Sequence, residues 1–160
     1  MLFRGTIAAA VIVPLVGTAG IAAERAIKPI EVSVQTASAK LVSAQEKEAM
    51  DFRQLQTELM VAALSCGRPE YRNKYNTFVV RYRPALKRNA RILKTIFNRN
   101  YGSSGKRRLN SYVTQIANDV SVVSMERPEF CAVAGRKFNA VLGASSRATA
   151  GGLLQRAQRQ

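Results

Sequence analysis

Histidine and tryptophan are absent from this chain of 160 residues, and cysteine occurs only twice. Without histidine the sequence contains no Ser-His-Asp or Cys-His nucleophile, no histidine-ligated haem and none of the common zinc sites. Two cysteines cannot by themselves complete a four-cysteine zinc site or hold an iron–sulfur cluster. Glycine and proline are also scarce, at 10 and 5 residues, which excludes collagen-like and low-complexity chains. We therefore expect a non-enzymatic globular protein without a cofactor or a metal.

Carboxylates are few compared with cations: 10 Asp and Glu against 25 Lys and Arg, a formal net charge of +15. The excess is concentrated in residues 71–118, forty-eight residues that contain no Asp or Glu. One explanation of this concentration of cations is a solvated basic face. A polyanionic partner explains it better, because nothing within the segment relieves the repulsion between like charges. The cations of this central segment are Arg72, Lys74, Arg81, Arg83, Lys87, Arg88, Arg91, Lys94, Arg99, Lys106, Arg107 and Arg108.

The sequence does not identify one anionic partner, but it restricts the classes. We expect an anionic lipid, lipopolysaccharide, or an acidic polymer or protein, so a membrane surface is included. Sequence-specific nucleic-acid binding is not expected, because helix-turn-helix, zinc-finger and RNP motifs are absent. The competing hypothesis is a structural or chaperone-like protein that binds a partner through an apolar helical groove. Our candidate anion-binding residues are Arg81, Lys87, Arg91, Lys94, Lys106, Arg107 and Arg108.

Residues 1–22 have the layout of a secretory signal peptide. Arg4 gives a basic start, an apolar run covers residues 6–21, and small residues follow. Cleavage after Ala22 would place Gly20 and Ala22 at positions −3 and −1. The alternative is an uncleaved membrane anchor, for which the apolar run is short. We predict a periplasmic or secreted protein.

Export determines what the two cysteines are expected to do. In an oxidising compartment, Cys66 and Cys131 are expected to form one disulfide. Two buried free thiols are the alternative. A redox-active pair is not expected, because the two are not in a C-x-x-C motif.

Residues 46–142 show helical periodicity and predict an all-α domain, a small bundle of four to five helices. Apolar side chains recur there at three- and four-residue steps, and no stretch alternates as a strand does. Pro84 allows either two helices or one kinked helix. Residues 23–45 are predicted to be a flexible tether, and residues 143–160 a disordered tail. The expected helices cover 46–66, 70–82, 86–97, 109–123 and 130–142.

The predicted helix over 86–97 is apolar on more than one face. Ile92 and Ile96 lie between the stripe of leucines and the cations on the opposite side. This pattern favours burial against two neighbouring helices. The alternative is an apolar patch exposed beside cations, as in helices that lie on a membrane surface.

Six short runs stand out in residues 50–142: LMVAALSC (59–66), YNTFV (75–79), PAL (84–86), YG (101–102), AN (117–118) and FC (130–131). Together they resemble a family of small, uncharacterised, exported bacterial helical proteins. The resemblance implies no catalytic or binding residue, and it favours a structural role for the two cysteines.

Overall fold

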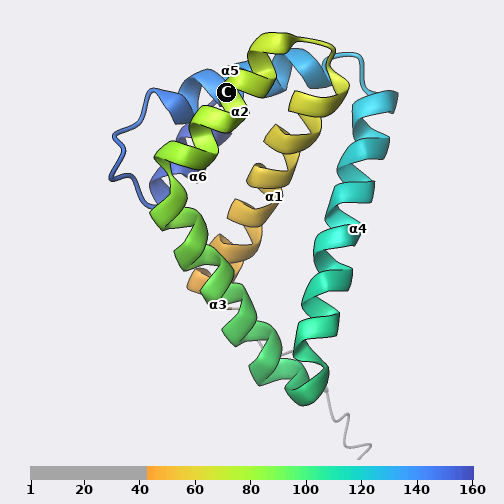
Figure 1. Ribbon diagram of the computed structural model, residues 1–160, viewed down its shortest axis with the longest axis vertical. Coiled ribbons are helices and arrows are strands. Elements are labelled where there is room, and N and C mark those ends of the chain that lie inside the picture. The colour runs from red at the N-terminus through yellow and green to blue at the C-terminus, as the bar shows by residue number, and fades with distance from the viewer. Residues whose placement is uncertain (1–42) are drawn as a thin grey trace, which may run out of the picture. The chain divides into compact units, whose positions relative to one another are not determined.

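The structure is a computed structural model that describes residues 43–160. The predicted signal peptide and most of the predicted tether lie outside the described residues. The described residues fold into α-helices and contain no strand, so the all-α prediction is confirmed (Figure 1). The helices are α1 (Ala44–Ser65), α2 (Pro69–Arg81), α3 (Arg83–Tyr101), α4 (Gly105–Glu126), α5 (Phe130–Leu142) and α6 (Ala150–Gln158), with a 3₁₀ turn, η1 (Gly102–Ser104), before α4.

Local sequence explains both ends of α1. The Ser43 hydroxyl accepts a hydrogen bond from the Glu46 N–H at 3.2 Å, and the Glu46 carboxylate accepts one from the Ser43 N–H at 3.0 Å. This capping box satisfies two donors that the first turn would otherwise leave unpaired. The helix ends at Cys66, where Gly67 takes a φ of 63° that disfavours any side chain.

Proline and glycine separate the helices that follow. Pro69 and Pro84 lie in the first turns of α2 and α3, where a missing N–H costs nothing. Tyr82 alone separates α2 from α3, so the structure has two helices here and not one kinked helix. At Gly105 a Cβ atom would lie 2.8 Å from the backbone of Asn98, so glycine lets α4 start close against α3.

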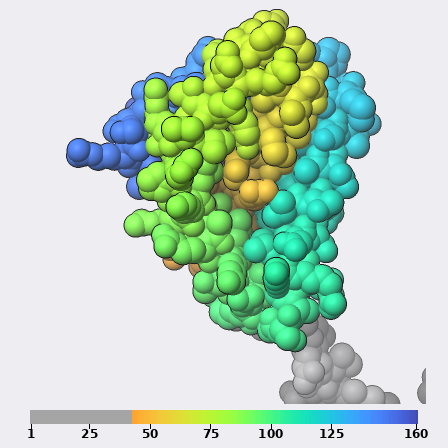
Figure 2. Space-filling view, in the orientation of Figure 1, coloured from red at the N-terminus to blue at the C-terminus, as the bar shows by residue number. Residues whose placement is uncertain are grey.

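Helix α1 lies at the centre of this helical unit and contacts each of the other five α-helices. The largest set of buried residues, the main core, consists of fifteen residues from α1, α2, α5, α6 and their connections. Phe52, Phe78, Tyr82 and Phe138 are all fully buried in it. Helices α3 and α4 add only two small clusters of buried residues against α1. Between these two helices, side chains of α1 are visible at the surface (Figure 2).

The structure corrects the prediction for residues 143–160. Thr149 caps α6 by accepting a hydrogen bond from the Gly152 N–H at 3.2 Å. Leu153, Leu154 and Ala157 then pack into the main core. The short helix is ordered because it buries an apolar face against α1 and α5, an effect that weak local periodicity does not reveal.

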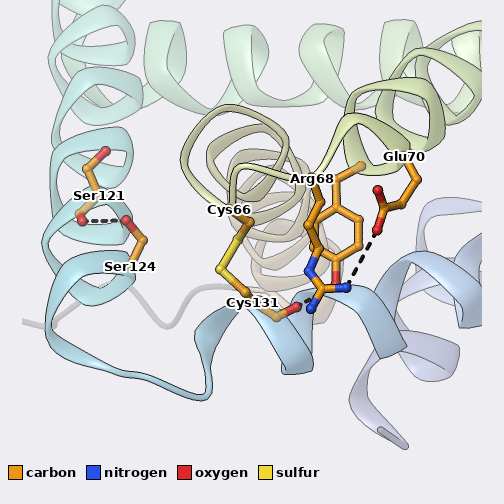
Figure 3. Close-up of a disulfide and its surroundings, with 7 residues drawn as sticks. Cys66, Arg68, Glu70, Ser121, Ser124 and Cys131 are labelled. Carbon is orange, nitrogen blue, oxygen red and sulfur yellow. Dashed lines mark hydrogen bonds and ion pairs between the residues drawn. A yellow bond between two sulfur atoms is a disulfide. The ribbon is translucent and has the colours of Figure 1, made fainter.

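A disulfide joins Cys66, at the end of α1, to Cys131, in the first turn of α5, with Cα atoms 5.7 Å apart (Figure 3). The predicted pairing is confirmed, and the described residues contain no free cysteine. Arg68 and Glu70 form an ion pair beside the bridge, at 3.5 Å. Within residues 43–160, no helix has the length and apolarity needed to cross a membrane.

Candidate anion-binding site

The cations of the central segment have almost no internal counter-charge. Within residues 43–160, Arg99 is the one member of this set that forms an ion pair with a carboxylate, that of Glu46. The other ion pairs join residues outside the segment. The first turns of α3 and α4 carry no acidic residue. Cations lie there instead, beside the positive ends of both helix dipoles. The cations of α3 and of the start of α4 therefore have little compensating negative charge close to them.

The seven candidate residues do not form one cluster. Arg81 donates a hydrogen bond to the Leu142 carbonyl at 2.6 Å, near the end of α5. The guanidinium of Arg108 lies over the Tyr101 ring, 5.6 Å from its centre. Lys94 is exposed on α3 and lines none of the hollows described below. These three side chains are thus spread over three helices.

Lys106 and Arg107 line a shallow depression along α4. Its other lining residues are polar and include a carboxylate, Asp119. The negative charge offsets part of the attraction that the two cations exert on an anion. This depression is consequently a weaker candidate than a hollow whose charged lining residues are all cations.

Lys87 and Arg91, the remaining two candidates, do lie together. They line a hollow of about 590 Å³ between α3 and the connection from α5 to α6. Three further cations line the same hollow, and no carboxylate does. We call it the basic hollow; its charged residues are Arg83, Lys87, Arg88, Arg91 and Arg147.

Helix geometry and one tyrosine bring these five cations together. Arg83, Lys87 and Arg91 are four residues apart, so they follow one face of α3. The opposite wall is the loop that carries Arg147. This loop is held at the start of α3 by Tyr82, whose buried hydroxyl lies 2.6 Å from the Val141 carbonyl oxygen and 3.0 Å from that of Ala144.

The composition of the basic hollow suits a multiply charged anion. Its five cationic side chains are exposed and can reorient toward a ligand. Ser146 and Thr149 supply hydroxyl groups, and Thr149 is also the N-cap of α6, where the helix dipole favours negative charge. Arginine guanidinium groups can bind phosphate oxygens through two parallel hydrogen bonds.

Sequence reasoning missed three of the five cations. Arg83 and Arg88 belong to the same dense run as Lys87 and Arg91, so helical spacing alone could have added them. The sequence gave no such signal for Arg147, because it lies 56 positions beyond Arg91. It also lies next to α6, a helix that is ordered only by its packing against the rest of the protein. The described residues contain no group of three His, Cys, Asp or Glu side chains that could hold a metal ion.

Comparison with protein-family models, with curated proteins and with solved structures returned no match. The assignment of this site therefore depends on its geometry and charge.

Proposed function

We propose that the chain is an exported, non-enzymatic binding protein that attaches to an anionic envelope surface through the basic hollow. The observation that carries this proposal is the set of five cations around one hollow without a carboxylate. Two features support export: the signal-peptide pattern of residues 1–22, and a disulfide of the kind that persists in oxidising compartments. The partner we favour is a phosphate-bearing lipid surface, either anionic phospholipid or lipopolysaccharide.

Attachment of this kind is electrostatic. A Lys or Arg near an anionic membrane contributes about 1 kcal/mol, and salt screens the attraction beyond about 10 Å at 0.1 M ionic strength. Three cations of the hollow acting together would therefore change affinity by about a hundredfold. A complex held by buried apolar contacts would keep its affinity as salt rises.

Co-sedimentation with vesicles tests the proposal. The purified protein is mixed with phosphatidylglycerol or phosphatidylcholine vesicles at low and at physiological salt. We expect it to sediment with the anionic vesicles and to be released as salt rises. Equal sedimentation with both lipids, or binding that salt does not weaken, would contradict electrostatic attachment.

Two variants with the same charge change locate the surface. Arg88→Gln, Arg91→Gln and Arg147→Gln remove three charges from the basic hollow, whereas Lys106→Gln, Arg107→Gln and Arg108→Gln remove three from the start of α4. All six side chains are exposed, so both triple variants should fold. We expect the first to lose about a hundredfold in affinity and the second clearly less. The reverse order would move the site to α4.

A further inference from the structure

A second hollow, of about 560 Å³, lies between α3 and α4 with α1 as its floor. We call it the groove. In the space-filling view, the side chains of α1 are seen between these two helices (Figure 2). Its lining comes from four helices, α1, α2, α3 and α4.

Each long wall of the groove carries apolar side chains among polar ones. On α3, Leu86, Ala90 and Leu93 follow one face, and on α4 Leu109 and Val113 are four residues apart. Leu86 and Leu93 are two helical turns apart, so this apolar strip is about 10 Å long. Leu93 is already buried, but the other four side chains keep apolar surface exposed, and covering it with a hydrocarbon chain would be favourable.

The floor of the groove contains a cation without a counter-ion. Arg53, on α1, is half-buried, and its Nη1 donates a hydrogen bond to Oε1 of Gln56 at 3.1 Å. Its Nε is shielded from solvent and has no hydrogen-bond partner. None of the ion pairs in residues 43–160 includes it. Since a partly buried charge is costly unless it is paired, an anion bound here would be attracted strongly.

The groove and the basic hollow are adjacent. Arg83 and Lys87 line both of them, so the two cations stand where the apolar strip meets the cluster of positive charge. A ligand with a negative head group and an apolar chain would meet cations and apolar walls in the same order. Neither inorganic phosphate nor a neutral hydrocarbon would use both surfaces.

We infer that the groove binds a single-chain amphiphile with an anionic head group, with the chain along the strip from Leu86 to Leu93. The head group would lie beside Arg83 and Lys87, within the field of Arg53. The volume of the groove falls in the range of small-molecule sites, about 300–1,000 Å³. A folded protein partner would need about 800 Å² of surface on each side, which a strip two turns long does not supply. This inference rests on the proposed function, because it names the lipid chemistry that the same face binds.

Calorimetric titration with three probes tests the inference. Dodecyl phosphate, inorganic phosphate and dodecyl maltoside are titrated separately into the purified protein, each amphiphile below its micelle concentration and all at one ionic strength. We expect dodecyl phosphate to bind at least tenfold more tightly than either other probe. If inorganic phosphate binds as tightly as dodecyl phosphate, the apolar strip has no role in binding. If dodecyl maltoside binds as tightly as dodecyl phosphate, the cations have no role in binding, and an apolar protein segment becomes the better candidate occupant.

A matched pair of variants locates the chain. Ala90 is exposed and lines the groove, so Ala90→Phe should fill it without disturbing the main core. Ala132 is exposed on α5 and lies outside the groove, so Ala132→Phe is the control. We expect Ala90→Phe to weaken dodecyl phosphate binding at least tenfold and Ala132→Phe to leave it unchanged. Equal affinity in both variants would overturn the assignment.

Arg53→Met tests the cation at the floor. Methionine keeps most of the volume and removes the unpaired charge. We expect tenfold weaker binding of dodecyl phosphate, unchanged binding of dodecyl maltoside, and a urea midpoint no lower than that of the parent protein. A parallel loss of both amphiphiles would show that Arg53 only shapes the groove.

The vesicle and amphiphile experiments can fail separately. Salt-sensitive attachment to phosphatidylglycerol vesicles without selective binding of dodecyl phosphate would overturn the groove inference alone. If the protein binds neither anionic vesicles nor dodecyl phosphate, both proposals are overturned.

Discussion

The two ends of the helical unit are built differently. At the disulfide end, α2, α5 and α6 surround α1, and fifteen buried residues form the main core. The α3–α4 hairpin buries only small clusters against α1: Ala49, Leu93, Ile96 and Phe97 at the other end, and Val61, Ile116 and Val120 closer to the disulfide. The disulfide end therefore provides most of the packing, whereas the hairpin carries most of the central cations.

This division suits a binding protein. Like charges along α3 and α4 repel each other and oppose compact packing, so they are tolerable only where the rest of the molecule is well anchored. In α4, which has 22 residues, only Gly105, Ile116 and Val120 are buried. Such a sparsely packed helix is expected to open locally more often than the main core.

The largest difference should appear when one phenylalanine is removed from each end. Phe52 is 0% exposed in the main core, and Phe97 is 7% exposed in a four-residue cluster. We expect Phe52→Ala to lower the free energy of unfolding by about 5 kcal/mol and Phe97→Ala by about 3 kcal/mol or less. Urea unfolding followed by circular dichroism measures both. An equal or larger loss for Phe97→Ala would contradict the comparison.

Removing the disulfide should weaken the anchored end. The bridge closes a loop between cysteines 65 residues apart, which corresponds to about 4 kcal/mol of stabilisation in the chain-entropy model. We expect the Cys66→Ala, Cys131→Ala variant to lose about this amount in urea unfolding. Intact mass after alkylation is the companion measurement. Two alkylated thiols without prior reduction of the parent protein would show that no bridge exists in solution.

Tyr82→Phe should have a smaller effect on stability and should also weaken vesicle binding. The substitution keeps the ring in the main core and removes the hydroxyl that contacts the Val141 and Ala144 carbonyls. We expect a loss of about 1–3 kcal/mol in the free energy of unfolding, because the Ala144 carbonyl loses the hydroxyl, whereas the Val141 carbonyl keeps a hydrogen bond from the Ala144 N–H. Binding to phosphatidylglycerol vesicles should also weaken, since the loop with Arg147 is released. Unchanged vesicle binding would mean that Tyr82 does not position that loop.

The smallest effect concerns Tyr112, where α4 packs on Phe97 with ring centres 5.4 Å apart. Burial raises the pKa of the Tyr112 hydroxyl above its ordinary value; Asp51 adds to the rise and Arg53 opposes it. The folded protein therefore keeps this proton to higher pH than the unfolded chain. Its stabilising contribution is complete below about pH 10, the unfolded pKa, and is lost as pH rises through the folded pKa. In the Tyr112→Phe variant, the urea midpoint should therefore fall less steeply with rising pH than in the parent protein. The same fall in both proteins would contradict this prediction.

Much of the local structure could be predicted because it depends on local chemistry. The periodicity of residues 46–142 predicts five helices, and α1 to α5 are all present. Their ends fall at glycine and proline because these residues interrupt helices wherever they occur. Of the two isoleucines expected to be buried on a second apolar face, Ile96 is buried and Ile92 is partly buried.

The candidate site was only partly predictable. The acid-free segment indicates a basic face, and Lys87 and Arg91 are in the candidate set. Sequence spacing could not tell which cations share a hollow, because that depends on which loop packs against α3. It also gave no indication that Arg53 is unpaired, since it lies in a near-neutral part of the chain.

By itself, the sequence determined the helical class, the breaks between α1 and α5, the excess of positive charge and, with only two cysteines, the single pairing they could form. These properties depend on residue types and on neighbours a few positions apart. Only the tertiary structure decided that α6 is ordered, that Arg147 joins the cations of α3, and that Arg53 lies beneath a groove. Each of these depends on burial against distant residues, whose free energy exists only after the helices have packed.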